Sequence, residues 1–410
     1  MNSSDPEIER LLVSADFLAD PYPLLERMQN EAPVYWSDAL GGWVVTRYDD
    51  VMLTFKDTAH FSNEGRLGKA IAYLPEEKRA RYGAFEDHFS HKSLLHSDPP
   101  DHTRMRALIT RELNAKVVEE IKPQIQAVVD ELIDDAIERG SMDVAADLAS
   151  PLPIRIMAHI LGVPNSDHHL FRKWADDLLA FQGVNKPAEE DLDRAQRAIV
   201  QMRPYVRQML EERRVSPKND LISKFAAAEA EGGKIEEEEL ISTCVTLFVA
   251  GQETTLSFIA NSMWALLANP SELDKARSEE ALLVSALEES LRFESPVSRQ
   301  PRLVKQDIEI DGRLIRRGEM VFQMLNAANR DPKYFPDPHR FVADRAPNRH
   351  LGFGFGIHFC VGALLARAEA KIAIDTALRR MPKMRLIDAT PDWDIEKRNS
   401  RVLKTLSVQV

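Results

Sequence analysis

The chain has 410 residues, of which 44% are hydrophobic and 29% charged, and its formal net charge at pH 7 is -12. This composition is that of an ordinary globular protein and argues against intrinsic disorder. The negative charge argues against a protein that coats nucleic acid or an anionic membrane, so we expect no nucleic-acid partner.

The first sixteen residues indicate a cytoplasmic protein. They carry Glu7, Glu9, Arg10 and Asp16 and contain no apolar segment of signal length. We therefore expect neither a signal peptide nor an N-terminal membrane anchor.

Aromatic and β-branched residues around Gly41-Gly42 predict a hairpin over 33–48, and Asp311-Gly312 predicts a second over 307–322. Helical spacing dominates the rest, and it predicts helices at 101–113, 115–138, 167–181, 191–214, 220–230, 236–268, 279–293 and 361–380. We expect a mainly α protein with small β-sheets. Without a repeat or a long linker, it should form a single domain over 1–410.

The acidic run "IEEEEL" at 235–240 is open to two interpretations. It could bind a basic partner, or it could begin the next helix, where carboxylates offset the positive end of the helix dipole. The second interpretation is favoured.

In the helix that follows, Glu253 is the only charged residue from 241 to 268, so the helix should be buried. "AGQETT" at 250–255 interrupts its apolar run, which argues against a membrane span. Gly251 weakens a helix by about 1 kcal/mol relative to alanine, and a buried Glu253 needs a partner or water. The hexapeptide is either a kink with a satisfied carboxylate, or a groove beside a flat group with Glu253 as a proton relay.

Cys244 and Cys360 are the only cysteines, too few for a disulfide framework or an iron–sulfur cluster. Cys360 lies in "LGFGFGIHFCVGALLARAEAKIA", directly before a predicted helix whose N–H groups favour a thiolate. It could be a buried structural cysteine, a nucleophile or a metal ligand. A lone thiolate in a dry, glycine-lined loop best suits one axial bond to a haem iron.

Residues 353–362, "FGFGIHFCVG", resemble the cysteine-ligand loop of the cytochrome P450 haem-thiolate monooxygenases, F-G-x-G-x-H-x-C-x-G. The resemblance extends from the first hairpin to the end of the chain and implies the P450 fold, with a long central helix over the haem. It implies haem b as cofactor and Cys360 as the iron ligand. The haem contacts implied in this loop are Phe353, Gly354, His358 and Gly362.

Other motifs follow in the family's order. "AGQETT" resembles the oxygen-activation helix, which implies Ala250 and Gly251 beside the haem and Glu253 and Thr254 as the acid–alcohol pair. "HTRMR" at 102–106 and "RLVKQD" at 302–307 imply His102, Arg106 and Arg302 as propionate partners together with His358, and His350 is a further candidate. "ESLR" at 289–292 and "FPDPHRF" at 335–341 imply a buried structural network of Glu289, Arg292 and Arg340.

The resemblance implies a bacterial-type monooxygenase that inserts one oxygen atom of O2 into a C–H or C=C bond of a lipophilic molecule, such as a terpenoid, steroid or fatty acid. Thr254 would hold a distal water chain, and Glu253 would connect it to solvent. The substrate cavity would be bordered by residues 61–95 and 181–186 and by Leu247, Val249, Val297, Met324 and Val402.

No flavin or ferredoxin domain fits in the remaining sequence, so electrons should come from a separate ferredoxin and its reductase. We expect an acidic ferredoxin to bind at Arg104, Arg111 and Arg367. Two alternatives stay open. A peroxide-driven peroxygenase would not need the acid–alcohol pair, and a non-catalytic haem sensor or carrier would keep Cys360 without needing Thr254.

Overall fold

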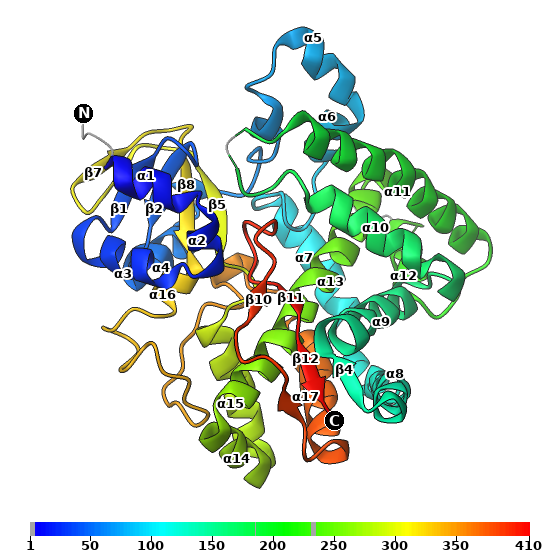
Figure 1. The fold of residues 1–410 in the computed structure, drawn as a ribbon. Helices are drawn as coiled ribbons and strands as arrows, with labels where there is room; N and C mark the ends of the chain where they lie inside the picture. The colour runs from blue at the N-terminus through cyan, green and yellow to red at the C-terminus, as the bar shows by residue number, and fades with distance from the viewer. Residues whose placement is uncertain (1–4, 185, 231–234) are drawn as a thin grey trace. The chain divides into compact units, whose positions relative to one another are not determined.

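The computed structural model describes residues 5–184, 186–230 and 235–410 (Figure 1). Contacts between Cα atoms divide the chain into two compact units. The first unit comprises residues 1–61, 121–152 and 253–410, and the second comprises 62–120 and 153–252. The expectation of one domain over 1–410 stays a prediction.

The main sheet of the first unit has five strands in the order β1-β2-β8-β5-β3. These strands are β1 (Val34–Ser37), β2 (Gly42–Val45), β8 (Met320–Met324), β5 (Arg299–Val304) and β3 (Phe61–Ser62). Strands β1 and β2 form the predicted antiparallel hairpin, and β2 continues the sheet in parallel with β8. A Cβ at Gly42 would lie 2.6 Å from the carbonyl oxygen of Met320, so this close strand approach requires a glycine.

The other strands of the first unit form small sheets. The second predicted hairpin is confirmed as β6 (Ile308–Ile310) and β7 (Arg313–Ile315), whose turn residues Asp311 and Gly312 both have positive φ, the signature of a tight hairpin turn. The remaining strands form β4-β12-β9 and β10-β11, with bounds β4 (Ser141–Asp143), β9 (Arg385–Leu386), β10 (Asp392–Trp393), β11 (Leu403–Thr405) and β12 (Ser407–Gln409).

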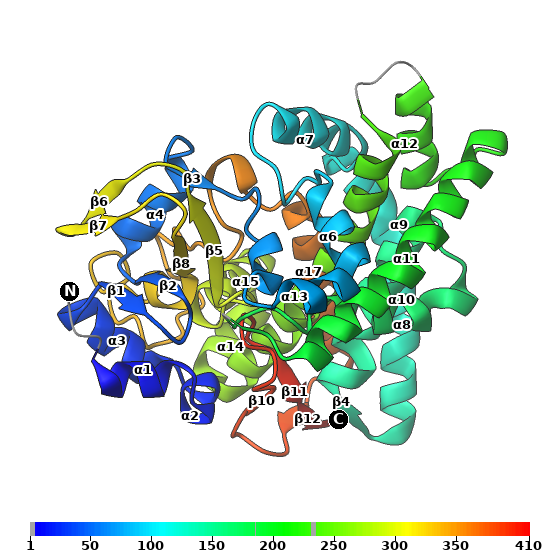
Figure 2. The ribbon, with the colours of Figure 1, turned by 90° about the horizontal axis from the view of Figure 1, so that it is seen from above.

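Short N-terminal helices lie beside the main sheet, as Figures 1 and 2 both show. The helices of the first unit are α1 (Pro6–Leu12), α2 (Ala15–Ala19), α3 (Tyr22–Glu31), α4 (Tyr48–Lys56), α14 (Pro270–Ser278), α15 (Glu280–Phe293), α16 (Leu325–Ala328) and α17 (Ala363–Arg380). Fully buried residues such as Val45, Val51, Val321 and Leu325 form the core between the sheet and these helices.

The second unit is helical, and its long helix α11 (Glu189–Val215) packs against neighbours on several sides. The unit contains α5 (Glu76–Arg79), α6 (Gly83–Ser90), α7 (Asp101–Glu112), α10 (His168–Leu179) and α12 (Leu221–Ala230), with short turns η1 (Gly68–Ile71), η2 (Ala80–Tyr82) and η4 (Asn165–Asp167). Helices α8 (Ala115–Arg139), α9 (Pro151–Leu161) and α13 (Glu237–Ala268) have residues in both units.

The acidic run confirms the helix-start interpretation. Helix α13 begins at Glu237, and the carboxylates of its first turn pair with arginines of the second unit. Glu239 accepts two hydrogen bonds of 2.8 Å from Arg104, and Glu237 accepts one of 3.1 Å from Arg207. The negative charges of these glutamates are therefore balanced by arginines of the protein itself.

One helical stretch, Val144–Leu161, is long and apolar enough to cross a membrane by composition alone. It combines the π-helical turn η3 (Val144–Ala149) with α9, and 72% of it is buried inside the protein, which is also typical of a core helix.

Candidate haem-thiolate site

Cys360 lies in a loop that its own backbone closes. The Cys360 N–H donates to the Phe353 carbonyl at 2.9 Å, and the Gly354 N–H donates to the Leu351 carbonyl at 2.8 Å. Gly354 and Gly356 have φ of +69° and +72°, a left-handed conformation that side chains disfavour. The thiol is exposed and stands three residues before the 18-residue helix α17 begins.

Phe55 on α4 packs against both glycines of this loop. A Cβ at Gly356 would lie 3.0 Å from the Phe55 carbonyl oxygen, and one at Gly354 would lie 3.5 Å from its ring. The same ring lies 5.3 Å from the guanidinium carbon of Arg302, which is buried on β5. Phe55, which the sequence did not suggest, therefore brings the predicted propionate partner Arg302 close to the cysteine loop.

The central helix faces the loop through aromatic contacts. The Phe258 ring of α13 packs edge-on against Phe353, with centroids 6.1 Å apart, and Phe353 packs against Phe359 at 6.3 Å. Thr254 precedes Phe258 by four residues, so the two side chains share one helix face. The predicted alcohol therefore lies on the same face of α13 as Phe258, which contacts Phe353 of the cysteine loop.

A second layer of polar contacts holds Phe353. The Arg367 guanidinium lies 4.5 Å from the Phe353 ring and makes two hydrogen bonds, of 2.7 and 2.8 Å, to Glu288. His350 Nε2 lies 3.0 Å from the same carboxylate, and its Nδ1 accepts the Gly352 N–H at 3.1 Å. Burial alone would raise the pKa of Glu288, but these hydrogen bonds lower it to about 2. Both ring nitrogens of His350 are therefore engaged in this layer.

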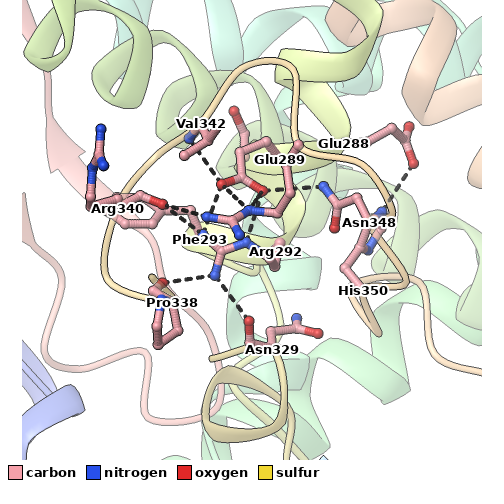
Figure 3. A network of polar contacts seen from close by, with 12 residues as sticks. Glu288, Glu289, Arg292, Phe293, Asn329, Pro338, Arg340, Val342, Asn348 and His350 are labelled. Carbon is pink, nitrogen blue, oxygen red and sulfur yellow. Dashed lines mark hydrogen bonds and ion pairs between the residues drawn. The ribbon is translucent and has the colours of Figure 1, made fainter. Parts of the chain in front are cut away.

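Glu289 and Arg292 form the predicted buried pair on α15 (Figure 3). Neither side chain is exposed, and their two hydrogen bonds are both 2.8 Å long. Arg292 also donates to the backbone carbonyls of Asn329, Pro338 and Arg340 at 2.8–3.0 Å. All five guanidinium N–H donors are thus used.

The second arginine of this network is Arg345, which corrects the prediction of Arg340. Arg345 Nε lies 2.9 and 3.1 Å from the two Glu289 oxygens, and its side chain is 7% exposed. The Arg340 side chain is 72% exposed and points away from the network, which receives only its carbonyl oxygen (Figure 3). The reason is a tight turn at Asp337, which has φ of +47° and accepts the Arg340 N–H, so that the chain re-enters the network five residues later.

Glu253 has a cationic neighbour, as its burial required. Lys397 Nζ lies 2.7 Å from Glu253 Oε2, an ion pair without the alignment of a hydrogen bond, and the Glu253 side chain is 14% exposed. At Gly251, a Cβ would lie 3.1 Å from Met157 Cγ, so close packing against α9 explains the glycine. A haem contact for Gly251 stays a prediction.

The other predicted site residues lie in both units. The second unit holds His102 and Arg106 on α7, and Leu247, Val249 and Ala250 on α13. Burial, and then the charge of Arg106, lower the pKa of His102. The first unit holds Val297, Met324 and Val402, of which Met324 and Val402 are buried.

The three arginines expected to bind a ferredoxin all have acidic partners. Arg104 and Arg367 are paired with Glu239 and Glu288, and their side chains are 24% and 35% exposed. Arg111 pairs with Glu112 at 2.6 Å and is 59% exposed, so it is the most accessible of the three.

The two cysteines differ in chemistry. Burial, then the charge of Asp220, raise the pKa of Cys244 to about 12, so that thiol stays protonated, whereas Cys360 is exposed. Within the described part of the chain, no group of three or more His, Cys, Asp or Glu residues could hold a metal ion. The single exposed Cys360 would be able to ligate an iron that a porphyrin already holds. At Gly362 a Cβ would lie 3.9 Å from this sulfur, which is an ordinary van der Waals contact.

Comparison with known proteins shows the family to which the chain is similar. The cytochrome P450 family model matches residues 72–410. The cytochrome P450 monooxygenase PikC of Streptomyces venezuelae is 38% identical over 95% of this chain and 90% of its own length. The structure of P450BioI with an acyl carrier protein carrying hexadec-9Z-enoic acid has a TM-score of 0.88 and 34% identity, covering 97% of this chain and all of the other. CYP109E1 from Bacillus megaterium, solved with testosterone, has a TM-score of 0.87 and 33% identity, covering 97% and 99%.

The fold and the cysteine loop define a haem-dependent oxygenase. The chain belongs to the cytochrome P450 family and is an oxidoreductase that incorporates oxygen.

Proposed function

We propose that this enzyme binds haem b through Cys360 and hydroxylates or epoxidises a lipophilic small molecule in the cytoplasm. The observation that carries the proposal is the exposed Cys360 in its glycine loop, whose Phe353 packs against Phe258 of α13. When bound, the haem supplies the activation of O2 and the transfer of one oxygen atom. Arg302, His358 and, from the second unit, His102 and Arg106 would hold its propionates.

Thr254 and Glu253 are proposed to manage protons. The Thr254 hydroxyl would hold a water on the distal side of the haem, and Glu253 would pass protons to it from solvent. The ion pair with Lys397 supports this role, since a neighbouring ammonium keeps the Glu253 carboxylate in place beside Thr254, in the middle of α13. The pair also argues against a peroxide-driven enzyme, which needs no such acid.

The substrate class is inferred from the lining and from relatives. Met324 and Val402 are buried apolar side chains of the first unit, and Leu247 and Val249 are buried on α13. Solved relatives carry a steroid in one case and a fatty acyl chain on a carrier protein in another. Electrons would come from a separate ferredoxin and reductase, with Arg111 as the most accessible contact.

The test is spectroscopic. Purified protein should contain haem and, when reduced under carbon monoxide, show the red-shifted Soret band of a thiolate ligand. Cys360→Ser should abolish the band, whereas the matched control Cys244→Ala should retain it. Addition of ferredoxin, reductase and NAD(P)H to a substrate that shifts the spin state should give an oxygenated product. A thiolate spectrum and a spin shift without turnover would favour the sensor or carrier alternative.

A further inference from the structure

Glu288 on α15 is bonded to two segments of the chain that both belong to the surroundings of the cysteine loop. Arg367 on α17 donates to its two carboxylate oxygens, at 2.7 and 2.8 Å. His350 Nε2 lies 3.0 Å from the same carboxylate (Figure 3), and the His350 side chain is 6% exposed. Through these two partners, a residue of α15 reaches Phe353 from its ring side and from its backbone side.

The arginine contact holds a guanidinium over the Phe353 ring. The guanidinium carbon of Arg367 lies 4.5 Å from the ring centroid, which is a cation–π distance. The two N–H groups that bond Glu288 lie in the guanidinium plane, so the carboxylate sets how that plane meets the ring. The ring also packs against Phe258 and Phe359, with centroids 6.1 and 6.3 Å away. Without Glu288, the long arginine side chain would regain its rotamer freedom and no longer be held over the ring.

The histidine contact fixes the tautomer of His350. An ionised carboxylate can only accept hydrogen bonds, so His350 Nε2 carries the proton and Nδ1 is an acceptor. Nδ1 accepts the Gly352 N–H at 3.1 Å. Gly352 also packs directly on α15, where a Cβ would lie 2.9 Å from the Leu291 carbonyl oxygen. Glu288 thereby keeps the backbone just before Phe353 against the helix.

Phe353 is in turn bonded to the cysteine. Its carbonyl oxygen accepts the Cys360 N–H at 2.9 Å, so a shift of Phe353 would shift the backbone that carries the sulfur. Residues that orient a metal ligand in this way also tune the metal. For a haem iron, the hydrogen bonds and the water that reach its axial ligand are among the factors that set the reduction potential.

We propose that Glu288 is a positioning residue for the Cys360 thiolate and thereby controls the reduction potential of the haem iron. Arg367 and His350 carry its effect to Phe353. Without the carboxylate, the loop would loosen and admit water to the sulfur. Water donates hydrogen bonds to sulfur and stabilises the more negatively charged ferrous state, so the potential should rise. The inference rests on the proposed function, because it requires Cys360 to be the iron ligand.

A purely structural role for Glu288 makes a different prediction. Such a residue would only tie α15 to α17, and the chain contains a second ion pair that does this. Glu280 of α15 pairs with Lys371 of α17, and its side chain is 75% exposed. Glu280 is therefore the matched control for the link between the two helices.

The test is spectroelectrochemical titration of the holoenzyme without substrate or ferredoxin. Glu288→Ala should shift the equilibrium between ferric and ferrous iron about tenfold toward ferrous, which is about 59 mV for one electron. Glu280→Ala should keep the wild-type potential. Arg367→Met and His350→Phe, which each remove one contact, should raise the potential by less. Glu288→Asp, which keeps the charge, should restore part of the difference.

The carbon monoxide spectrum of the same samples separates this inference from the proposed function. A wild-type protein without the thiolate Soret band would remove both. A wild-type band, together with equal potentials for Glu288→Ala and Glu280→Ala, would overturn the inference alone. If Glu288→Ala does not retain haem, the single-contact variants decide the question. A raised potential in Arg367→Met or His350→Phe would support the inference, and wild-type potentials in both would overturn it.

Discussion

Arg345 donates from one nitrogen, Nε, to both carboxylate oxygens of Glu289, at 2.9 and 3.1 Å. Together with Arg292, it gives the fully buried Glu289 two cationic partners. Amide donors from Val342 and Asn348 reach the same carboxylate at 3.0 and 3.2 Å. One acid therefore fixes the course of the irregular segment that leads to the cysteine loop.

Arg345→Ala should destabilise the protein much more than Arg340→Ala. Removal of one partner from a buried ion pair costs about 3–5 kcal/mol, whereas an exposed substitution changes stability by about 0.5 kcal/mol or less. Urea unfolding followed by circular dichroism measures both. Similar losses for the two variants would show that the ion pair between Arg345 and Glu289 does not stabilise the protein.

Thr254→Val should lower product formation about 100-fold while leaving haem content and substrate affinity unchanged, because only the hydroxyl is removed and a positioned proton donor contributes roughly 10²–10⁴-fold. Thr255→Val, at the neighbouring buried position, is the control. Steady-state turnover with a ferredoxin and its reductase is the measurement. Equal activity in the two variants would exclude Thr254 from proton delivery.

Glu369→Gln should stabilise the protein at neutral and alkaline pH. Glu369 on α17 is 1% exposed, and burial raises its pKa from 4.5 to about 8. Between these two pKa values, Glu369 takes up a proton when the protein folds. The free energy of unfolding therefore falls as the pH rises from about 4.5 to about 8. At pH 7 the loss of stability is on the order of 3 kcal/mol.

Urea unfolding at pH 5 and pH 8 tests this linkage. The wild-type protein should lose stability over this interval relative to Glu369→Gln, and the exposed control Glu309→Gln should behave like wild type. A constant difference between Glu369→Gln and wild type at the two pH values would show that Glu369 is ionised in the folded protein.

Gly162→Ala should destabilise the second unit severely, whereas Gly140→Ala should cost only about 1–2 kcal/mol from its left-handed backbone. The two glycines have φ of +76° and +71°, but a Cβ at Gly162 would lie 2.2 Å from Asp220 Oδ2, and one at Gly140 would meet nothing within 4 Å. Asp220 forms a buried 2.7 Å ion pair with Arg213, which the substitution would break. Thermal unfolding of both variants measures the difference.

Helices and hairpins could be predicted because the sequence patterns that indicate them lie within each element. Both hairpins carry glycine turns, and all eight predicted helices are present, with ends that differ by a few residues. Several helices were not predicted, and in two of them, α9 and α14, Pro151, Pro153 and Pro270 at their starts hide the helical pattern.

Contacts between distant segments were not predictable. The need of Glu253 for a partner followed from the sequence, but Lys397 lies 144 residues later and no pattern points to it. Phe55 beside Arg302 is a similar case. The prediction of Arg340 was wrong because this segment has no repeating geometry that would indicate which side chains point inward.

The Glu289 network also limits the insertions and deletions that the protein can accept. Residues 336–348 contain no helix or strand, so a surface loop of this kind would ordinarily accept insertions and deletions. Here donors at 342, 345 and 348 must all reach one carboxylate, which fixes the spacing between them. Length variation in this protein should therefore be rare in this segment and more common at the exposed Asp311-Gly312 turn.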